Sequence, residues 1–175
     1  MKTLFRLFVL PGFILATSSL CTFSQPVNIG ANYGGGIIFY IDGTGNHGLI
    51  AAPSDQSSAM QWGCYGNSIG GTHGAIGNGQ TNTTAIINGC SEVSTAASIC
   101  HNLVLNGFND WFLPSKGELN MMYIKKAVIG GLANDEYWSS SEYDVYTAWT
   151  QDFTSSKQER AAKKNTKNVR AIRAF

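Results

Sequence analysis

Short apolar runs separated by glycine and other turn residues recur along the chain and predict a protein built largely of short strands. The runs at residues 37–41 and 48–52 flank Gly43–Asn46, a segment with the composition of a turn. Apolar runs of this length on either side of turn residues predict a β-hairpin.

The second half of the chain repeats this pattern. Residues 148–153 and 158–162 flank a polar turn and predict a second hairpin, and further strands are expected around Trp138 and at the end of the chain through Phe175. The apolar residues beside Trp111 and Trp138 indicate that these rings, with Phe175, belong to the core.

Helical spacing of apolar residues appears in three segments, namely residues 81–88, residues 94–103 and the segment after Pro114. The third has the clearest signal, because Ser115 and Glu118 form a capping box, in which each side chain satisfies a backbone N–H at the helix start. Leu119, Met122 and Tyr123 follow at helical spacing and are expected to face the core.

Residues 63–79 contain seven glycines, which is too many for regular structure and predicts a long surface loop held by Trp62 and Cys64. Strands and helices of this kind favour an α+β fold, with a small twisted antiparallel sheet, two or three short helices and long glycine-rich loops. Residues 25–175 have the length of one ordinary domain.

Residues 1–24 have the features of a signal peptide: a basic start, a mostly apolar stretch at residues 7–20 and small residues before a cleavage point near Ser24. The apolar stretch is too short to be a good membrane span, so no transmembrane segment is expected after cleavage. Lipid attachment at Cys21 is an alternative, but Leu20 stands where such a site has a small residue.

The charge of the chain is unevenly distributed. If Lys2 and Arg6 leave with the signal, ten basic residues remain of the 12, against 11 acidic ones. This balance argues against a nucleic-acid partner. Residues 26–150 carry three basic and nine acidic side chains, whereas residues 151–175 carry seven and two, so the C-terminal end is a local positive patch.

Three cysteines follow the predicted signal peptide, and export would favour a disulfide between two of them. Cys90 and Cys100 flank a short turn between two predicted helices and are the preferred pair. Closing this short loop would stabilise the fold by about 3 kcal/mol. Cys64 would then be unpaired, so a Cys64–Cys90 bond and a Cys64–Cys100 bond are the alternatives.

Motifs for catalysis lack the context that they need. Ser68 lies in a Gly-x-Ser-x-Gly pattern, but within the glycine-rich segment rather than between a strand and a helix. His47, His73 and His101 are far apart, with no spacing typical of a metal site. We therefore expect no enzyme activity and no cofactor.

Calcium is the one ion that the acidic residues suggest. Four of them bracket the strand around Trp138: Asp135, Glu136, Glu142 and Asp144. Loop carboxylates of this kind can hold Ca²⁺. Their order does not match an EF-hand, and solvated loop acids are the preferred interpretation.

Basic residues crowd the second hairpin and the turn after it: Lys157, Arg160, Lys163, Lys164 and Lys167. They are candidates to bind sulfate or carboxylate groups of a polysaccharide, or they are a solvated strand face that protects a sheet edge from aggregation. Trp62, beside the glycine-rich loop, is the tryptophan expected to be exposed and to join them. Arg170 and Arg173 are instead expected to pair with buried carboxylates such as Asp110 or Glu142.

Three segments together resemble a known family: Gly107–Ser115 with Glu118–Leu119, Tyr137–Glu142, and Val169–Arg173. The chain from about Gly34 to Phe175 is similar to the Lcl C-terminal domain family, which includes the terminal domain of the Legionella collagen-like adhesin. The resemblance implies a C-type-lectin-like fold, export to the bacterial surface, periplasm or medium, and binding of sulfated glycans.

The chain also departs from these relatives. It lacks the collagen-like stalk, so binding strengthened by trimerisation is not implied. The order of residues 109–111 differs from the Trp-Asn-Asp strand of calcium-dependent lectins, so sugar binding through calcium is not implied either.

The sequence therefore predicts an exported, non-enzymatic module that binds a glycan or a cell-surface protein. A structural or protein–protein interaction domain without glycan affinity is the alternative, and a small hydrolase using Ser68 is the least favoured.

Overall fold

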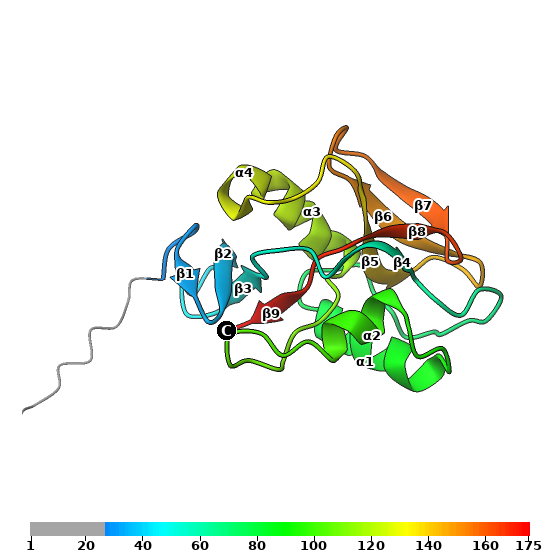
Figure 1. The fold of residues 1–175 in the computed structure, drawn as a ribbon. Coiled ribbons are helices and arrows are strands. Elements are labelled where there is room, and N and C mark those ends of the chain that lie inside the picture. The colour runs from blue at the N-terminus through cyan, green and yellow to red at the C-terminus, as the bar shows by residue number, and fades with distance from the viewer. Residues whose placement is uncertain (1–26) are drawn as a thin grey trace, which may run out of the picture.

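The computed structural model describes residues 27–175, which form two β-sheets with helices packed against them (Figure 1). The predicted signal peptide and the alternative at Cys21 lie outside the described residues. The first sheet has the order β1-β2-β3-β9 and is antiparallel throughout. Its strands are β1 (Asn32–Tyr33), β2 (Gly36–Ile41), β3 (Gly48–Ala51) and β9 (Ile172–Ala174).

The first sheet contains the predicted early hairpin, now seen as β2 and β3, and a tighter hairpin that the sequence pattern did not predict. Gly34 and Gly35 join β1 to β2 with φ of +51° and +88°. Positive φ at both central residues is the geometry of a type I′ turn, in which glycine meets no steric penalty.

The second sheet has the order β4-β8-β5-β6-β7. Its strands are β4 (Ser57–Gln61), β5 (Glu136–Glu142), β6 (Thr147–Asp152), β7 (Gln158–Ala162) and β8 (Thr166–Val169). The late hairpin is confirmed as β6 and β7. The prediction of one antiparallel sheet is wrong in two respects, because there are two sheets and because β8 runs parallel to β5. Strand β8 reaches β5 after the β6–β7 hairpin, a long-range connection without a local signal.

In the described part of the chain, four helices pack around the sheets: α1 (Gly79–Gly89), α2 (Ala96–His101), α3 (Lys116–Ile124) and α4 (Lys126–Ile129). The capping box of Ser115 and Glu118 begins α3, as predicted. Leu119 and Met122 are buried, whereas Tyr123 is only partly buried. Within residues 27–175, no helix has the length and apolar character to cross a membrane.

Three tryptophans fill the core. Trp111 and Trp138 are buried as predicted, and Phe175 packs against the core from a partly buried position. The exposure predicted for Trp62 is wrong, because this side chain is 0% exposed and its Nε1 donates to the Ser139 carbonyl at 2.8 Å.

The two late arginines are buried and paired. Arg173 donates to both carboxylate oxygens of Asp110 at 2.7 Å, which confirms this predicted partner. The expectation that the carboxylate is buried is wrong for Asp110, because half of its side chain is exposed. Arg170 pairs with Asp55 at 2.6 Å, a partner that the sequence did not suggest.

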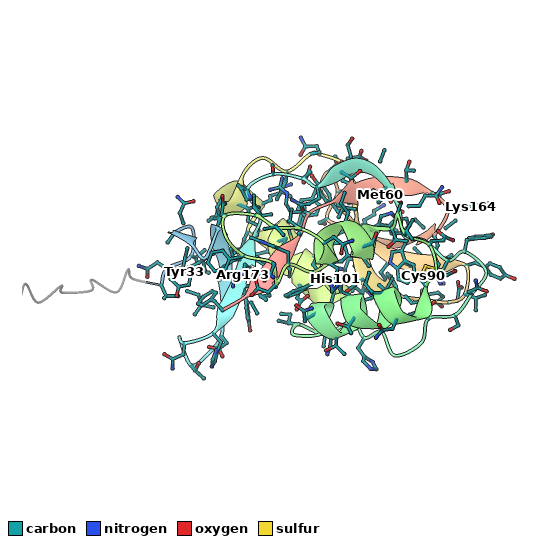
Figure 2. The ribbon with its side chains drawn as sticks, turned by 60° about the horizontal axis from the view of Figure 1, so that its bottom comes forward. Tyr33, Met60, Cys90, His101, Lys164 and Arg173 are labelled. Atoms are coloured by element: carbon teal, nitrogen blue, oxygen red, sulfur yellow. A yellow bond between two sulfur atoms is a disulfide. The ribbon has the colours of Figure 1, made fainter. Side chains whose placement is uncertain are left out.

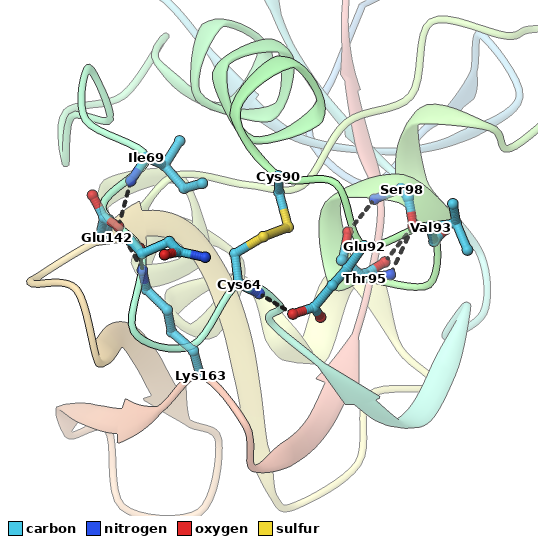
Figure 3. The surroundings of a disulfide bond; sticks show 10 residues. Cys64, Ile69, Cys90, Glu92, Val93, Thr95, Ser98, Glu142 and Lys163 are labelled. Atoms are coloured by element: carbon cyan, nitrogen blue, oxygen red, sulfur yellow. Dashed lines mark hydrogen bonds and ion pairs between the residues drawn. A yellow bond between two sulfur atoms is a disulfide. The ribbon is translucent and has the colours of Figure 1, made fainter.

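The disulfide joins Cys64 to Cys90, so the preferred Cys90–Cys100 pairing is wrong and one of the open alternatives is correct (Figure 3). Cys100 is a free, buried thiol on α2, and burial raises its pKa. It lies on the face of α2 that enters the core with Ala96 and Ala97. The disulfide therefore ties the glycine-rich loop to the end of α1 instead of linking α1 to α2.

Candidate functional site

The glycine-rich loop, residues 63–78, has no helix or strand but is fixed at both ends and in the middle. The disulfide holds its start, and the Cys64 N–H also donates to Glu92 Oε1 at 2.9 Å. Near its end, the Gly77 N–H donates to Glu118 Oε1 at 2.8 Å. A loop with its polar backbone groups paired in this way is an ordered part of the surface.

The middle of the loop is fastened by an ion pair, visible to one side of the disulfide in Figure 3. Lys163 Nζ lies 2.5 Å from Glu142 Oε1 and also donates to the Asn67 carbonyl at 2.9 Å. Glu142 accepts in addition from the backbone N–H groups of Ile69 and Gly70 at 2.9 and 3.0 Å. Burial alone would raise the pKa of Glu142, but the hydrogen bonds from Lys163 and these amides outweigh it and lower the pKa.

Lys163 is therefore wrongly included among the predicted ligand-binding residues. Its side chain is 0% exposed, and Nζ lies 4.7 Å from the centre of the Trp62 ring. Trp62 is excluded with it, because neither side chain reaches the surface. Both residues instead support the loop from beneath.

Lys167 and Lys157 are the weakest of the remaining candidates for ligand binding. Lys167 lies 3.0 Å from Glu136 Oε2, so its charge is already partly balanced. Lys157 is exposed in the turn between β6 and β7, at the opposite end of β7 from Lys164.

Arg160 and Lys164 are placed differently, because each cation lies against an exposed tyrosine. Arg160 Cζ is 4.3 Å from the ring centre of Tyr143, and Lys164 Nζ is 4.8 Å from that of Tyr65. Both distances are within the range of cation–π attraction. Among the described residues, neither cation has a carboxylate partner within salt-bridge distance.

Two further aromatic contacts extend these pairs. Tyr146 lies 5.3 Å from Tyr65, ring centre to ring centre, and Trp149 meets Tyr143 edge to face at 5.5 Å. Lys116 Nζ lies 3.3 Å from the centre of the Trp149 ring. We call this surface the aromatic–basic face, made of Tyr65, Lys116, Tyr143, Tyr146, Trp149, Arg160 and Lys164.

The tyrosines of this face are open to solvent, with 44% of Tyr65, 50% of Tyr143 and 52% of Tyr146 exposed. The β5–β6 turn carries both Tyr143 and Tyr146, one from each group of rings. Exposed ring faces beside cations without acidic partners can bind a ligand that has both apolar C–H surfaces and negative charges.

Sequence reasoning missed the tyrosines. The cluster of basic residues suggested the right hairpin, but Tyr65 lies about 100 positions before Lys164 along the chain. The available signal was that Tyr143 and Tyr146 lie between the strand expected around Trp138 and the one at residues 148–153, since large aromatic residues between two strands are rarely all core.

Ser68 lies in the loop with no strand before it, and its Oγ is 3.5 Å from Glu142 Oε2 rather than beside a histidine. Two of the acidic residues considered for calcium are engaged in other contacts. Glu142 is engaged by Lys163, and Asp144 accepts from the N–H groups of its own turn. In the described part of the chain, no group of three or more His, Cys, Asp or Glu side chains is placed to hold a metal ion.

Comparison with known proteins identifies the class. The family model of the Lcl C-terminal domain matches residues 52–173, and the chain belongs to this family. The match includes the glycine-rich loop and every residue of the aromatic–basic face. It is the signature of an adhesin-related surface module. No curated protein matches the chain.

Proposed function

We propose that this protein is an exported, non-enzymatic module that binds an anionic polysaccharide on its aromatic–basic face. The observation that carries the proposal is the pairing of Arg160 and Lys164 with exposed tyrosines, on a loop and a hairpin that are both held in place. Sulfate or carboxylate groups would pair with the cations, and the sugar C–H faces would stack on the rings.

Membership in an adhesin-related family supports the export and the lectin-like architecture that this proposal includes. The disulfide between Cys64 and Cys90 supports export as well, because disulfides persist in oxidising compartments.

Heparin chromatography tests the site. The wild-type protein should be retained at low salt and released as salt rises, because exposed ion pairs are screened. The double variant Arg160→Ala/Lys164→Ala should bind about a hundredfold more weakly or worse, since each of two charged hydrogen bonds contributes about 1.5–3 kcal/mol. Lys163 is left unchanged in this experiment, because removing a buried charge would confuse binding with folding.

Lys125→Ala is the charge-matched control for a single lysine variant, since Lys125 lies at the junction of α3 and α4. Retention of Lys125→Ala should match that of the wild type, whereas Lys164→Ala should elute earlier. Equal elution of the two variants, or a wild-type protein that passes through at low salt, would reject the aromatic–basic face and favour a structural or protein–protein role.

A further inference from the structure

A concave site lies far from the aromatic–basic face, in the first sheet. Figure 2 shows Tyr33 and Lys164 at opposite ends of the molecule. A cavity of about 420 Å³ opens beside Tyr33, between the β1–β2 turn and Asn106. This volume is in the range of small-molecule sites. Among the residues that the structure describes, no charged side chain lines it.

The walls are two tight turns that face each other. Gly34 and Gly35 form one, and Asn106 with Gly107, at φ of +53° and +84°, forms the other. The two turns are joined directly, because Asn106 Nδ2 donates to the Gly35 carbonyl at 2.7 Å.

The first turn is also fixed from below. Arg173 Nη1 donates to the Gly34 carbonyl at 3.0 Å, and the Asp110 carboxylate holds the guanidinium in place. A Cβ at Gly34 would lie 2.4 Å from Arg173 Nη1, so glycine is required here by the packing beneath. Both carbonyls of the turn are therefore engaged before any ligand arrives.

Engaging the carbonyls leaves the other polar groups of the cavity free. Within residues 27–175, the N–H groups of Gly34 and Gly35 donate to no protein acceptor. The side-chain oxygen of Asn106 and the amide of Asn32 have no protein partner in the same part of the chain. The residues that line the cavity thus carry two backbone donors without a protein acceptor and two side-chain amides, none with a formal charge.

Tyr33 supplies the apolar wall. Its ring meets Phe175 edge to face at 5.3 Å and is still 40% exposed. The negative face of an aromatic ring attracts the weakly positive C–H groups of a sugar. Hydroxyl groups both donate and accept, and so match a mixture of N–H and amide groups.

We propose that this cavity binds a neutral sugar residue, which stacks on Tyr33 and hydrogen-bonds the turn N–H groups and the two asparagines. The site is separate from the anionic-polysaccharide face and would add a second specificity to the same module. The family match begins at residue 52, so Tyr33 and the β1–β2 turn lie outside it.

Titration of the ¹⁵N-labelled protein, followed by NMR, tests this site. The probes are glucose, galactose, mannose and N-acetylglucosamine, each raised to about 100 mM to detect dissociation constants in the millimolar range. At least one sugar should shift the amide signals of Gly34 and Gly35 and the side-chain amide of Asn106. Tyr33→Ala should weaken this binding about tenfold, whereas Tyr33→Phe should retain it because the ring is kept.

Asn106→Gly keeps a residue that adopts positive φ readily and removes the amide, so it should also weaken binding. Glucuronate should bind no better than the neutral sugars. No shifts with any sugar, shifts that persist in Tyr33→Ala, or clearly tighter binding of glucuronate would overturn the proposal. Heparin retention of Tyr33→Ala should equal that of the wild type, so failure of either site is seen separately.

Discussion

Lys163 and Glu142 form a buried ion pair, with 2.5 Å between Nζ and Oε1, beneath the glycine-rich loop. The neighbouring Lys164 points to solvent over Tyr65 instead. Two adjacent lysines of the same turn therefore have different roles: the first holds the loop in place, and the second is available to a ligand.

Replacing Lys163 by Met should strongly destabilise the protein. The change leaves Glu142 buried without its partner, and removing one member of a buried pair costs about 3–5 kcal/mol. Lys164→Met is the matched control and should change the free energy of unfolding by less than about 0.5 kcal/mol, as expected at an exposed position. Urea unfolding measures both, and similar losses in the two variants would contradict the assigned roles.

Acidic pH should lower the stability of the fold, partly because Glu142 becomes protonated. The pKa of this carboxyl is lower in the folded state than its ordinary value of 4.5. Its contribution to stability is therefore complete above the unfolded pKa and is lost as pH falls through the folded pKa. Asp110 acts in the same direction, because its hydrogen bonds with Arg173 lower its pKa.

Glu118 acts in the opposite direction, since burial raises its pKa and so its contribution weakens as pH rises. The variant Glu142→Gln separates the effect of Glu142 on acid stability from the effects of Asp110 and Glu118. Unfolding free energies measured from neutral pH into the acid range should fall less steeply for this variant than for the wild type. Parallel curves would show that Glu142 does not carry the acid sensitivity.

The disulfide should stabilise the fold by limiting the unfolded chain. For cysteines 26 positions apart, the chain-entropy relation gives about 3.5 kcal/mol. The double variant Cys64→Ser/Cys90→Ser should lose about this much and should also expose the loop around Tyr65 to proteolysis. Peptide mapping without reductant should recover Cys64 linked to Cys90, and a Cys90–Cys100 peptide would show the assignment to be wrong.

Gly79 should tolerate no side chain. A Cβ there would lie 2.2 Å from Glu118 Oε2 and 2.7 Å from the Phe112 ring. Gly79→Ala should therefore destabilise by about 1–3 kcal/mol through overpacking. Gly43→Ala is the control, because a Cβ at Gly43 meets nothing within 4 Å, and its melting temperature should stay near that of the wild type.

Local signals predicted the elements that depend on neighbouring residues. The capping box of Ser115 and Glu118 placed the start of α3 because both partners lie within one helical turn. The runs of strand residues on either side of a turn segment placed the β2–β3 and β6–β7 hairpins for the same reason. The late basic cluster likewise pointed to the hairpin that carries the aromatic–basic face.

Other features were decided by contacts between distant segments. The partner of Cys64 depends on how the glycine-rich loop returns to α1, which no spacing along the chain reveals. Trp62 was expected to be exposed because it precedes a glycine-rich segment. Its indole N–H instead donates to the carbonyl of Ser139, 77 positions away.

The sequence by itself determined the α+β class, the β2–β3 and β6–β7 hairpins, the start of α3 and the resemblance to the family. Only the tertiary structure decided that Lys163 is buried while Lys164 is free, and that Arg160 and Lys164 lie against tyrosines. The physical reason is that turns and caps are stabilised by near neighbours. Burial and charge pairing depend on which distant strands meet, as when β5 brings Glu142 to Lys163, 21 positions away.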